Sequence, residues 1–125
     1  MSMTVDVELK KAFTELQQKM LETTQKVKLA DIQIESLKRS RQRADLTTLE
    51  IKALQENTMT YESLGRMFIR TPIPIVLENL NTRSVSCAEQ IKSLENNKAF
   101  LEKSMKESEN NLREMVQQRK EKQEK

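Results

Sequence analysis

Apolar side chains recur along two long stretches of the sequence, at alternating intervals of four and three residues. The first stretch, called seam one, consists of Leu9, Phe13, Leu16, Met20, Thr23, Val27, Ala30, Ile34, Leu37, Arg41 and Ala44. The second, called seam two, consists of Leu77, Leu80, Ser84, Cys87, Ile91, Leu94, Lys98, Leu101, Met105, Ser108, Leu112 and Met115. A narrow apolar stripe flanked by Lys, Glu and Gln is typical of a helix in a left-handed coiled coil. The pattern therefore predicts two long helices, over residues 5–45 and 75–119, followed by a frayed tail over residues 120–125.

The two seams have similar lengths and a short connection, so we expect them to pair as an antiparallel hairpin within one chain. Parallel dimerisation of two chains is the alternative. One register of the hairpin places Leu9 opposite Leu112 and Thr23 opposite Lys98. Two polar interruptions would then share one layer, which disfavours slipped pairings. A register displaced by one heptad would also keep the two seams facing each other.

The segment between the predicted helices, residues 46–74, contains several signals for the beginning or end of a helix. Thr47 and Glu50 have the spacing of a capping box, which predicts a short separate helix there. Pro72 and Pro74 prevent continued strand pairing, and Pro74 suits the first turn of the second long helix.

Residues 58–63 and 66–70 are rich in Thr, Tyr, Met, Phe and Ile, which predicts a β-hairpin. Gly65, the only glycine in the sequence, lies between them, where a positive φ angle favours glycine. The expected fold is therefore mainly α. It is an antiparallel two-helix coiled-coil hairpin with a small β-hairpin at the bend, formed as a single domain over residues 1–125.

The predicted β-hairpin carries apolar side chains on both faces, because Met67, Phe68 and Ile69 are consecutive and successive strand residues point to opposite faces. An isolated two-stranded hairpin is marginally stable in water, and its edges accept further strands. We therefore expect an obligate oligomer. The residues predicted to mediate its assembly are Tyr61, Leu64, Gly65, Met67, Phe68 and Ile69.

The composition agrees with a thin core, since 36% of the residues are hydrophobic and 33% are charged. The net charge is +3, with basic and acidic residues mixed along the whole chain. No apolar run approaches the roughly 18 residues of a membrane span, and no signal-peptide core is present. We expect a soluble cytoplasmic protein with no membrane partner. Cys87 is the only cysteine, and its seam position favours a buried structural thiol.

The sequence lacks the residues that most enzymes need. It has no histidine, so it has no His general base and no His metal ligand, and a single glycine excludes multi-glycine phosphate loops. Carboxylates such as Glu102, Glu107 and Glu109 are better explained by pairing along exposed helix faces than by acid/base chemistry. We expect no catalytic residues, no cofactor and no metal site.

One basic run, comprising Lys38, Arg39, Arg41 and Arg43, is a candidate nucleic-acid contact. It lies near the end of the first predicted helix, where cations complement the helix dipole. It also follows the heptads, whereas the basic region of a basic zipper precedes them. We therefore expect no nucleic-acid partner.

The sequence resembles the β-type subunits of prefoldin over nearly its whole length. In the predicted helices the resemblance is carried by VELKKAFTELQQKM, KVKLADIQIESL and FLEKSMKESENNLREM. In the hairpin it is carried by Tyr61, Glu62, Gly65, Arg66, Met67, Phe68 and Ile69. The chain departs from the family in the segment TPIPIV, residues 71–76, where relatives are more polar.

This resemblance implies an ATP-independent co-chaperone of six subunits, two α-type and four β-type. Their hairpins would join in a double β-barrel from which the coiled coils project. The implied clients are unfolded proteins of the actin and tubulin type, which would be passed to the cytosolic chaperonin.

Apolar residues in or next to the seams near the free ends of the helices lack a full set of neighbours and are therefore candidates for client binding. They are Val5, Leu9, Phe13, Leu112, Met115 and Val116. Methionine suits contact with many unrelated sequences because its side chain is flexible and polarizable. The alternative function is a structural coiled-coil scaffold that links defined protein partners.

Overall fold

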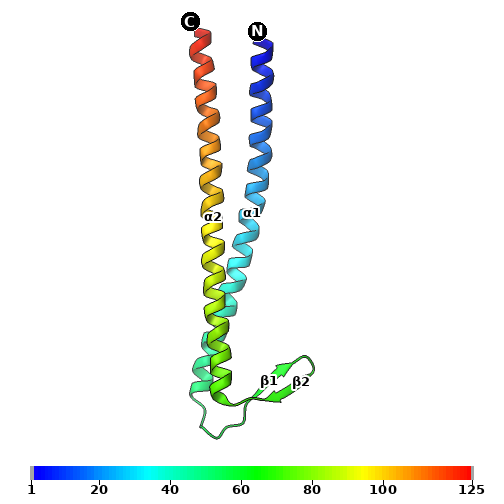
Figure 1. Cartoon of the computed structure of the whole chain (residues 1–125), viewed down its shortest axis with the longest axis vertical. Helices are drawn as coiled ribbons and strands as arrows, with labels where there is room; N and C mark the ends of the chain where they lie inside the picture. The colour runs from blue at the N-terminus through cyan, green and yellow to red at the C-terminus, as the bar shows by residue number, and fades with distance from the viewer. Residues whose placement is uncertain (1, 125) are drawn as a thin grey trace. The chain divides into compact units, whose positions relative to one another are not determined.

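A computed structural model describes residues 2–124 and, among these, the side chains of residues 7–122. The order of elements is α1 (Ser2–Lys52), β1 (Tyr61–Leu64), β2 (Met67–Arg70) and α2 (Ile73–Glu124). Figure 1 shows the two long helices and the small hairpin that connects them. The prediction of a mainly α fold with an antiparallel two-stranded hairpin is confirmed.

The chain divides into two compact units. The central unit is Ile32–Leu94, and it holds the hairpin with the adjoining parts of both helices. The terminal unit is formed by the stretch of α1 that ends at Asp31 and the stretch of α2 that begins at Glu95. Each unit contains the two helices in antiparallel orientation (Figure 1).

In the central unit, the helices pack through the predicted seams. The buried apolar side chains of this unit are Ile34, Ala44, Val76, Cys87 and Ile91. All of them except Val76 are seam positions. The prediction that Cys87 is a buried thiol is confirmed, and the cysteine is free. Removal of these side chains from water provides the main stabilisation of a two-helix contact.

Both long helices extend further than the sequence predicted. The separate short helix expected at Thr47 is not present, because α1 continues to Lys52. The Thr47 hydroxyl donates to the backbone oxygen of Arg43 (2.7 Å), which is a bond inside a helix and not a cap. Similarly, α2 continues to Glu124, beyond residue 119, where the second helix was predicted to end.

The second long helix begins at Ile73, with Pro74 in its first turn as predicted. The missing N–H of Pro74 costs nothing there, because the first N–H groups of a helix have no intrahelical partner. Instead, the amides of Ile75 and Val76 both donate to the backbone oxygen of Pro72 (3.0 and 3.1 Å).

The hairpin pairs Leu64 with Met67 and Tyr61 with Arg70, so the turn consists of Gly65 and Arg66. Gly65 has a φ angle of 62°, and no other described residue has a positive φ. A positive φ at the first of two turn residues only is the type II′ arrangement, which matches the twist of the strands. The predicted role of Gly65 is therefore confirmed, with strands that are somewhat shorter than expected.

The helices pair in a register one heptad away from the predicted one. In the terminal unit, Leu112 lies against Leu16 and not against Leu9. Lys98 reaches Asp31 (2.7 Å) instead of the level of Thr23. In the central unit, Ser84 donates to Asp45 (2.8 Å), which the predicted register would have kept apart.

Polar pairs beside the seams explain this displacement. The observed register joins Lys98 to Asp31, and the predicted one would have brought Thr24 to that place. It also joins Arg119 to Glu8 (3.2 Å) within the terminal unit. A shift of one heptad keeps the apolar seams facing each other, and the polar pairs beside the seams favour the observed register.

Candidate protein-binding surfaces

The β-hairpin exposes a set of large apolar side chains, here called the hairpin surface. Its members are Tyr61, Leu64, Met67, Phe68 and Ile69, all of which are exposed. Phe68 is the most exposed of the five, at 72%. These five, with Gly65 at the turn, are the residues that the sequence predicted to mediate assembly.

The strand register distributes these side chains over both faces of the hairpin. Directly paired residues share a face, so Tyr61 and Phe68 lie on one side. Leu64, Met67 and Ile69 lie on the other. Each face therefore presents aromatic or aliphatic carbon to water, and exposed apolar patches of this kind typically mark protein-binding sites.

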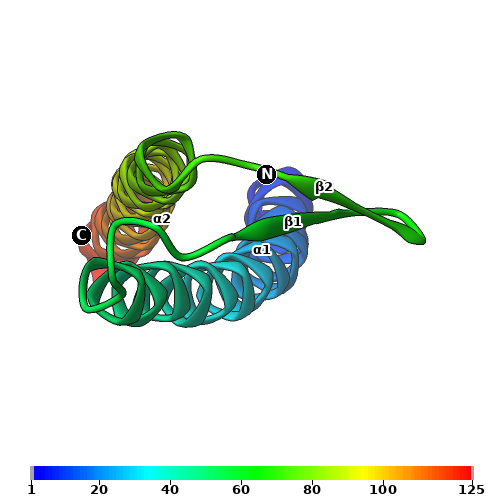
Figure 2. The same cartoon turned by 90° about the horizontal axis from the view of Figure 1, so that it is seen from below.

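The hairpin is fixed to the rest of the central unit at its base. Asn79 on α2 donates through its side-chain amide to Glu62 on β1 (3.0 Å). The backbone amide of Thr71 donates to the oxygen of Thr60 (2.9 Å), which closes the open end of the hairpin. Figure 2 shows the two strands extending side by side away from the helix ends that they connect.

The two strands form a sheet of their own within the part of the chain that the structure describes. The outer edge of each strand therefore carries backbone N–H and C=O groups that no other described strand pairs. Such edges readily accept strands from other chains. Apolar faces and open edges together make the hairpin suited to joining a larger sheet.

A second surface lies in the terminal unit, where α1 and α2 enclose a groove here called the terminal pocket. It has a volume of about 270 Å³, and its lining residues are Ala12, Glu15, Leu16, Lys19, Ser108, Asn111, Leu112 and Met115. Four of these lining residues are apolar and four are polar or charged, so the terminal pocket offers mixed contacts to a segment of another protein.

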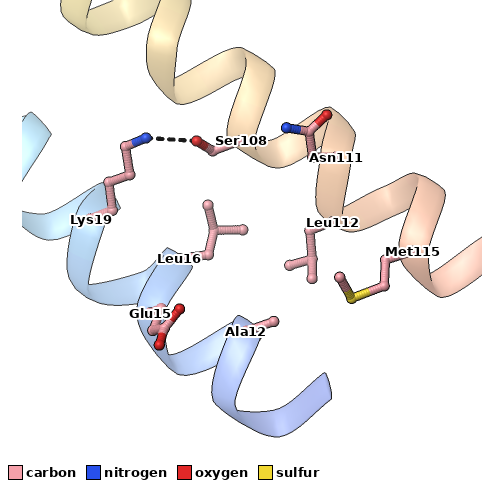
Figure 3. A pocket seen from close by; sticks show the side chains of 8 residues that line it. All are labelled: Ala12, Glu15, Leu16, Lys19, Ser108, Asn111, Leu112 and Met115. Atoms are coloured by element: carbon pink, nitrogen blue, oxygen red, sulfur yellow. Dashed lines mark hydrogen bonds between the residues drawn. The ribbon is translucent and has the colours of Figure 1, made fainter. Parts of the chain in front are cut away.

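The floor of the terminal pocket is apolar. Leu16 and Leu112 point toward each other across the groove, and the Met115 side chain lies beside Leu112 (Figure 3). Leu112 is 8% exposed, whereas Met115 remains 39% exposed. The pocket thus combines a fixed apolar base with a flexible side chain at its rim.

One end of the terminal pocket is polar and positively charged. The ammonium of Lys19 on α1 crosses to α2 and donates to the hydroxyl of Ser108 (2.7 Å) and to that of Ser104 (3.3 Å). Ser108 in turn donates to the backbone oxygen of Ser104 (3.1 Å). Glu15 lies at the opposite edge of the pocket from this ammonium (Figure 3).

The structure brings together only part of the predicted client-binding set. Leu112 and Met115 line the terminal pocket. Phe13 is 44% exposed but is not among the lining residues, and Leu9 and Val116 are half-buried. Val5 lies outside the residues whose side chains are described.

The sequence analysis missed four polar or small residues of this pocket: Glu15, Lys19, Asn111 and Ala12. Leu16 and Ser108 were recognised only as seam positions. Finding these residues requires the correct register between α1 and α2. Once Leu16 is placed opposite Leu112, the helix periodicity brings Lys19 to Ser108.

The cation with the clearest electrostatic environment is Lys98. Its hydrogen bond to Asp31 is the main cause that raises the pKa of Lys98 above 10.5, and the negative charges of Asp31, Glu102 and Glu95 act in the same direction. Partial loss of hydration opposes them. This pair supports the register and has no geometry suited to catalysis.

Among the described side chains, residues 7–122, no three metal-ligating groups of the His, Cys, Asp or Glu type converge on one point. Neither described helix has a stretch that is apolar enough over a sufficient length to cross a membrane. The described residues form two surfaces that are suited to binding protein, one in each unit.

Comparison with known proteins finds relatives over most of the chain. A family described as "Prefoldin subunit" matches residues 14–119. "Prefoldin subunit 1" of Mus musculus and that of Homo sapiens are each 50% identical over 119 residues, which is 95% of this chain and 98% of each relative. "Prefoldin subunit 1" of Arabidopsis thaliana is 42% identical over 108 residues, covering 86% of this chain and 84% of that protein.

A solved structure has the same fold. The crystal structure of the prefoldin beta subunit from Thermococcus strain KS-1 superposes with a TM-score of 0.71, at 16% sequence identity. The match covers 86% of this chain and 90% of that one. These matches agree with the two long heptad helices and with the β-hairpin that turns at Gly65. The chain therefore belongs to the prefoldin family.

Proposed function

We propose that this chain is one of six subunits, two α-type and four β-type, of an ATP-independent co-chaperone in the cytoplasm. The complex captures unfolded proteins and passes them to the cytosolic chaperonin. As a prefoldin subunit, the chain is part of a co-chaperone complex and assembles with other prefoldin subunits. The clients, of the actin and tubulin type, are those that its resemblance to the family implies.

The exposure of the hairpin surface is the observation that carries the proposal for assembly. Phe68, Met67, Leu64 and Tyr61 are each more than half exposed. Full burial of one such side chain contributes about 1.5–3 kcal/mol. Covering both faces with neighbouring hairpins, and pairing the open edges with their strands, would thus supply a large part of the association energy.

The terminal pocket supports the proposal for client binding. The terminal unit buries few of its seam residues: Ala30 and Leu112 are its buried apolar side chains among those described. Phe13, Met20 and Met115 remain exposed although they belong to the seams. Exposed apolar carbon around a groove provides weak, adaptable contact with unfolded chains.

Substitution of exposed residues of the terminal unit tests this function. We expect Phe13→Ser with Met115→Ser to weaken suppression of client aggregation strongly, because both changes remove exposed apolar area from the proposed client surface. The measurement is light scattering of a denatured client diluted into the assembled complex. The matched control is Leu21→Ser with Leu29→Ser, which removes exposed leucines of α1 outside the pocket.

Native mass measurement of both variants verifies that assembly is intact. Equal suppression by the wild-type complex and the Phe13 and Met115 variant would contradict the proposed client site. If the complex bound one folded partner and no denatured protein, the scaffold function would replace the chaperone function.

A further inference from the structure

We propose that the terminal pocket selects client segments in which an apolar side chain lies close to an Asp or Glu, and that Lys19 binds the carboxylate. This inference rests on the proposed function and names the class of segment that the client site takes. It makes Lys19 a specificity-determining residue beside the apolar floor of the groove.

The shape of the pocket indicates a mixed ligand. Leu16, Leu112 and Met115 form an apolar floor, and the Lys19 ammonium stands at one end of it (Figure 3). An aliphatic side chain seated against the floor would place the neighbouring residues of an extended segment near that ammonium. A carboxylate there would form a charge-assisted hydrogen bond, which is stronger than a hydrogen bond between neutral groups.

The present partners of Lys19 are hydroxyl groups. Its ammonium donates to Ser108 (2.7 Å) and Ser104 (3.3 Å), and the salt bridges found among the described side chains do not include it. An ammonium carries three donors and a full positive charge, which two neutral acceptors do not compensate. Lys19 therefore retains the capacity to bind an anion from outside the chain.

Two other cations of the terminal unit show the contrast. Lys98 crosses from α2 to Asp31 (2.7 Å), and Arg119 crosses to Glu8 (3.2 Å). In both cases the chain itself supplies a carboxylate on the opposite helix. At the pocket, the opposite helix supplies Ser104, Ser108 and Asn111 instead. The opposite helix provides no such carboxylate to Lys19, so the carboxylate of a ligand can occupy the corresponding position.

Glu15 adds a negative charge to the pocket and thereby restricts where an acidic residue of a bound segment can lie. It lines the edge opposite the Lys19 ammonium (Figure 3), so a carboxylate at that edge would be repelled. A bound segment is thus expected to point its acidic residue toward Lys19 and to avoid acidic residues near Glu15.

The test uses the assembled complex and three synthetic peptides that share a leucine-rich stretch and carry two Asp, two Asn or two Lys residues beside it. We expect fluorescence anisotropy to show about two- to fivefold tighter binding of the Asp peptide than of the Asn peptide, as for an exposed ion pair. Lys19→Met should remove this preference, so that the Asp and Asn peptides bind this variant with equal affinity. Lys11→Met, which makes the same charge change on α1 outside the pocket, should preserve it.

A second measurement locates the contact on this chain and not on its partner subunits. Carbodiimide coupling joins a carboxylate to a nearby lysine amine as an amide with loss of water, and mass spectrometry identifies the lysine. We expect Lys19 to be the main site that couples to the Asp peptide. Coupling spread evenly over Lys10, Lys11 and Lys26 would overturn the proposal.

The outcomes separate this inference from the proposed function. Equal affinity for the Asp and Asn peptides, or equal loss of preference in the Lys11 and Lys19 variants, would overturn the role of Lys19 while client binding stands. Failure of the wild-type complex to bind any of the three peptides would contradict the proposed client site together with this inference.

Discussion

Lys98 occupies a position in an apolar seam, yet the helices pair around it. Its long side chain extends to the flank of the seam, where the ammonium meets Asp31 at 2.7 Å. Lysine can keep its carbon stem along apolar surface while its charge remains near water. A polar residue in a seam is thus tolerated where the facing helix offers a carboxylate beside the seam.

The Lys98–Asp31 pair makes a pH-dependent contribution to stability. The folded-state pKa of Lys98 is raised above 10.5, mainly by the hydrogen bond to Asp31, so the folded state holds this proton more tightly than the unfolded state. The contribution is therefore complete below pH 10.5 and is lost as the pH rises through the raised pKa. It is small, because the pair is partly exposed to water.

We expect Asp31→Asn to lower the free energy of unfolding slightly at neutral pH, with the difference from wild type shrinking above pH 10.5. Urea unfolding followed by circular dichroism measures this difference. Glu35→Gln, a matched change at an exposed position of α1, should show no such trend. A wild-type advantage that grew with rising pH would contradict the assignment.

Gly65 is required by its backbone conformation and not by lack of space. A Cβ at this position would meet no atom within 4 Å, but the φ angle is +62°. We expect Gly65→Ala to destabilise the hairpin by roughly 1–3 kcal/mol, because a side chain is strained at the positive φ of this turn position. Hydrogen exchange of the β1 and β2 amides measures the loss. Equal protection in Gly65→Ala and wild type would refute the explanation.

At the scale of elements, the helix register is the feature most open to direct test. In a Cys87→Ser background, we expect Leu16→Cys with Leu112→Cys to form a disulfide readily under mild oxidation, because these side chains face each other (Figure 3). Disulfides require Cα atoms within about 7 Å. Leu9→Cys with Leu112→Cys should remain reduced, and non-reducing electrophoresis distinguishes the two. The opposite result would restore the register predicted from the sequence.

The two helices and the hairpin could be predicted from the sequence because their signals are local. Heptad spacing identified the seams, and buried residues such as Ile34, Cys87 and Ile91 belong to them. Gly65 between two strand-like stretches identified the turn. The side chains of the hairpin surface followed from alternation, since consecutive apolar residues in a strand must occupy both faces.

The register and the ends of the helices could not be predicted in the same way. A shift of seven residues leaves a heptad seam facing its partner, so the apolar pattern alone does not select one register. The choice depends on distant pairs such as Ser84 with Asp45. The capping-box spacing at Thr47 was misleading because a threonine hydroxyl can instead bond to the backbone one turn earlier.

The polar end of the terminal pocket was missed for the same reason. Lys19 flanks seam one, and nothing near it in sequence indicates a partner. Its contact with Ser108 joins residues 89 positions apart. Such a site becomes visible only when the pairing of the two helices is known.

At the scale of the whole molecule, the two proposed protein-binding surfaces differ in chemical character. The hairpin surface is strongly apolar on both faces and has open strand edges, which favours permanent association. The terminal pocket is a shallow groove with a charged end, which favours weak and reversible contact. One surface suits sister subunits and the other suits transient clients.

The central claim is that the hairpin surface is covered by other prefoldin subunits. Native mass measurement after co-expression with an α-type subunit and the remaining β-type subunits tests it most directly. We expect one particle of six subunits that contains this chain, and we expect Phe68→Ser with Met67→Ser to be excluded from that particle while its helical content is unchanged. A wild-type chain that stays monomeric beside these partners, or a hairpin variant that enters the particle as well as wild type, would contradict the account.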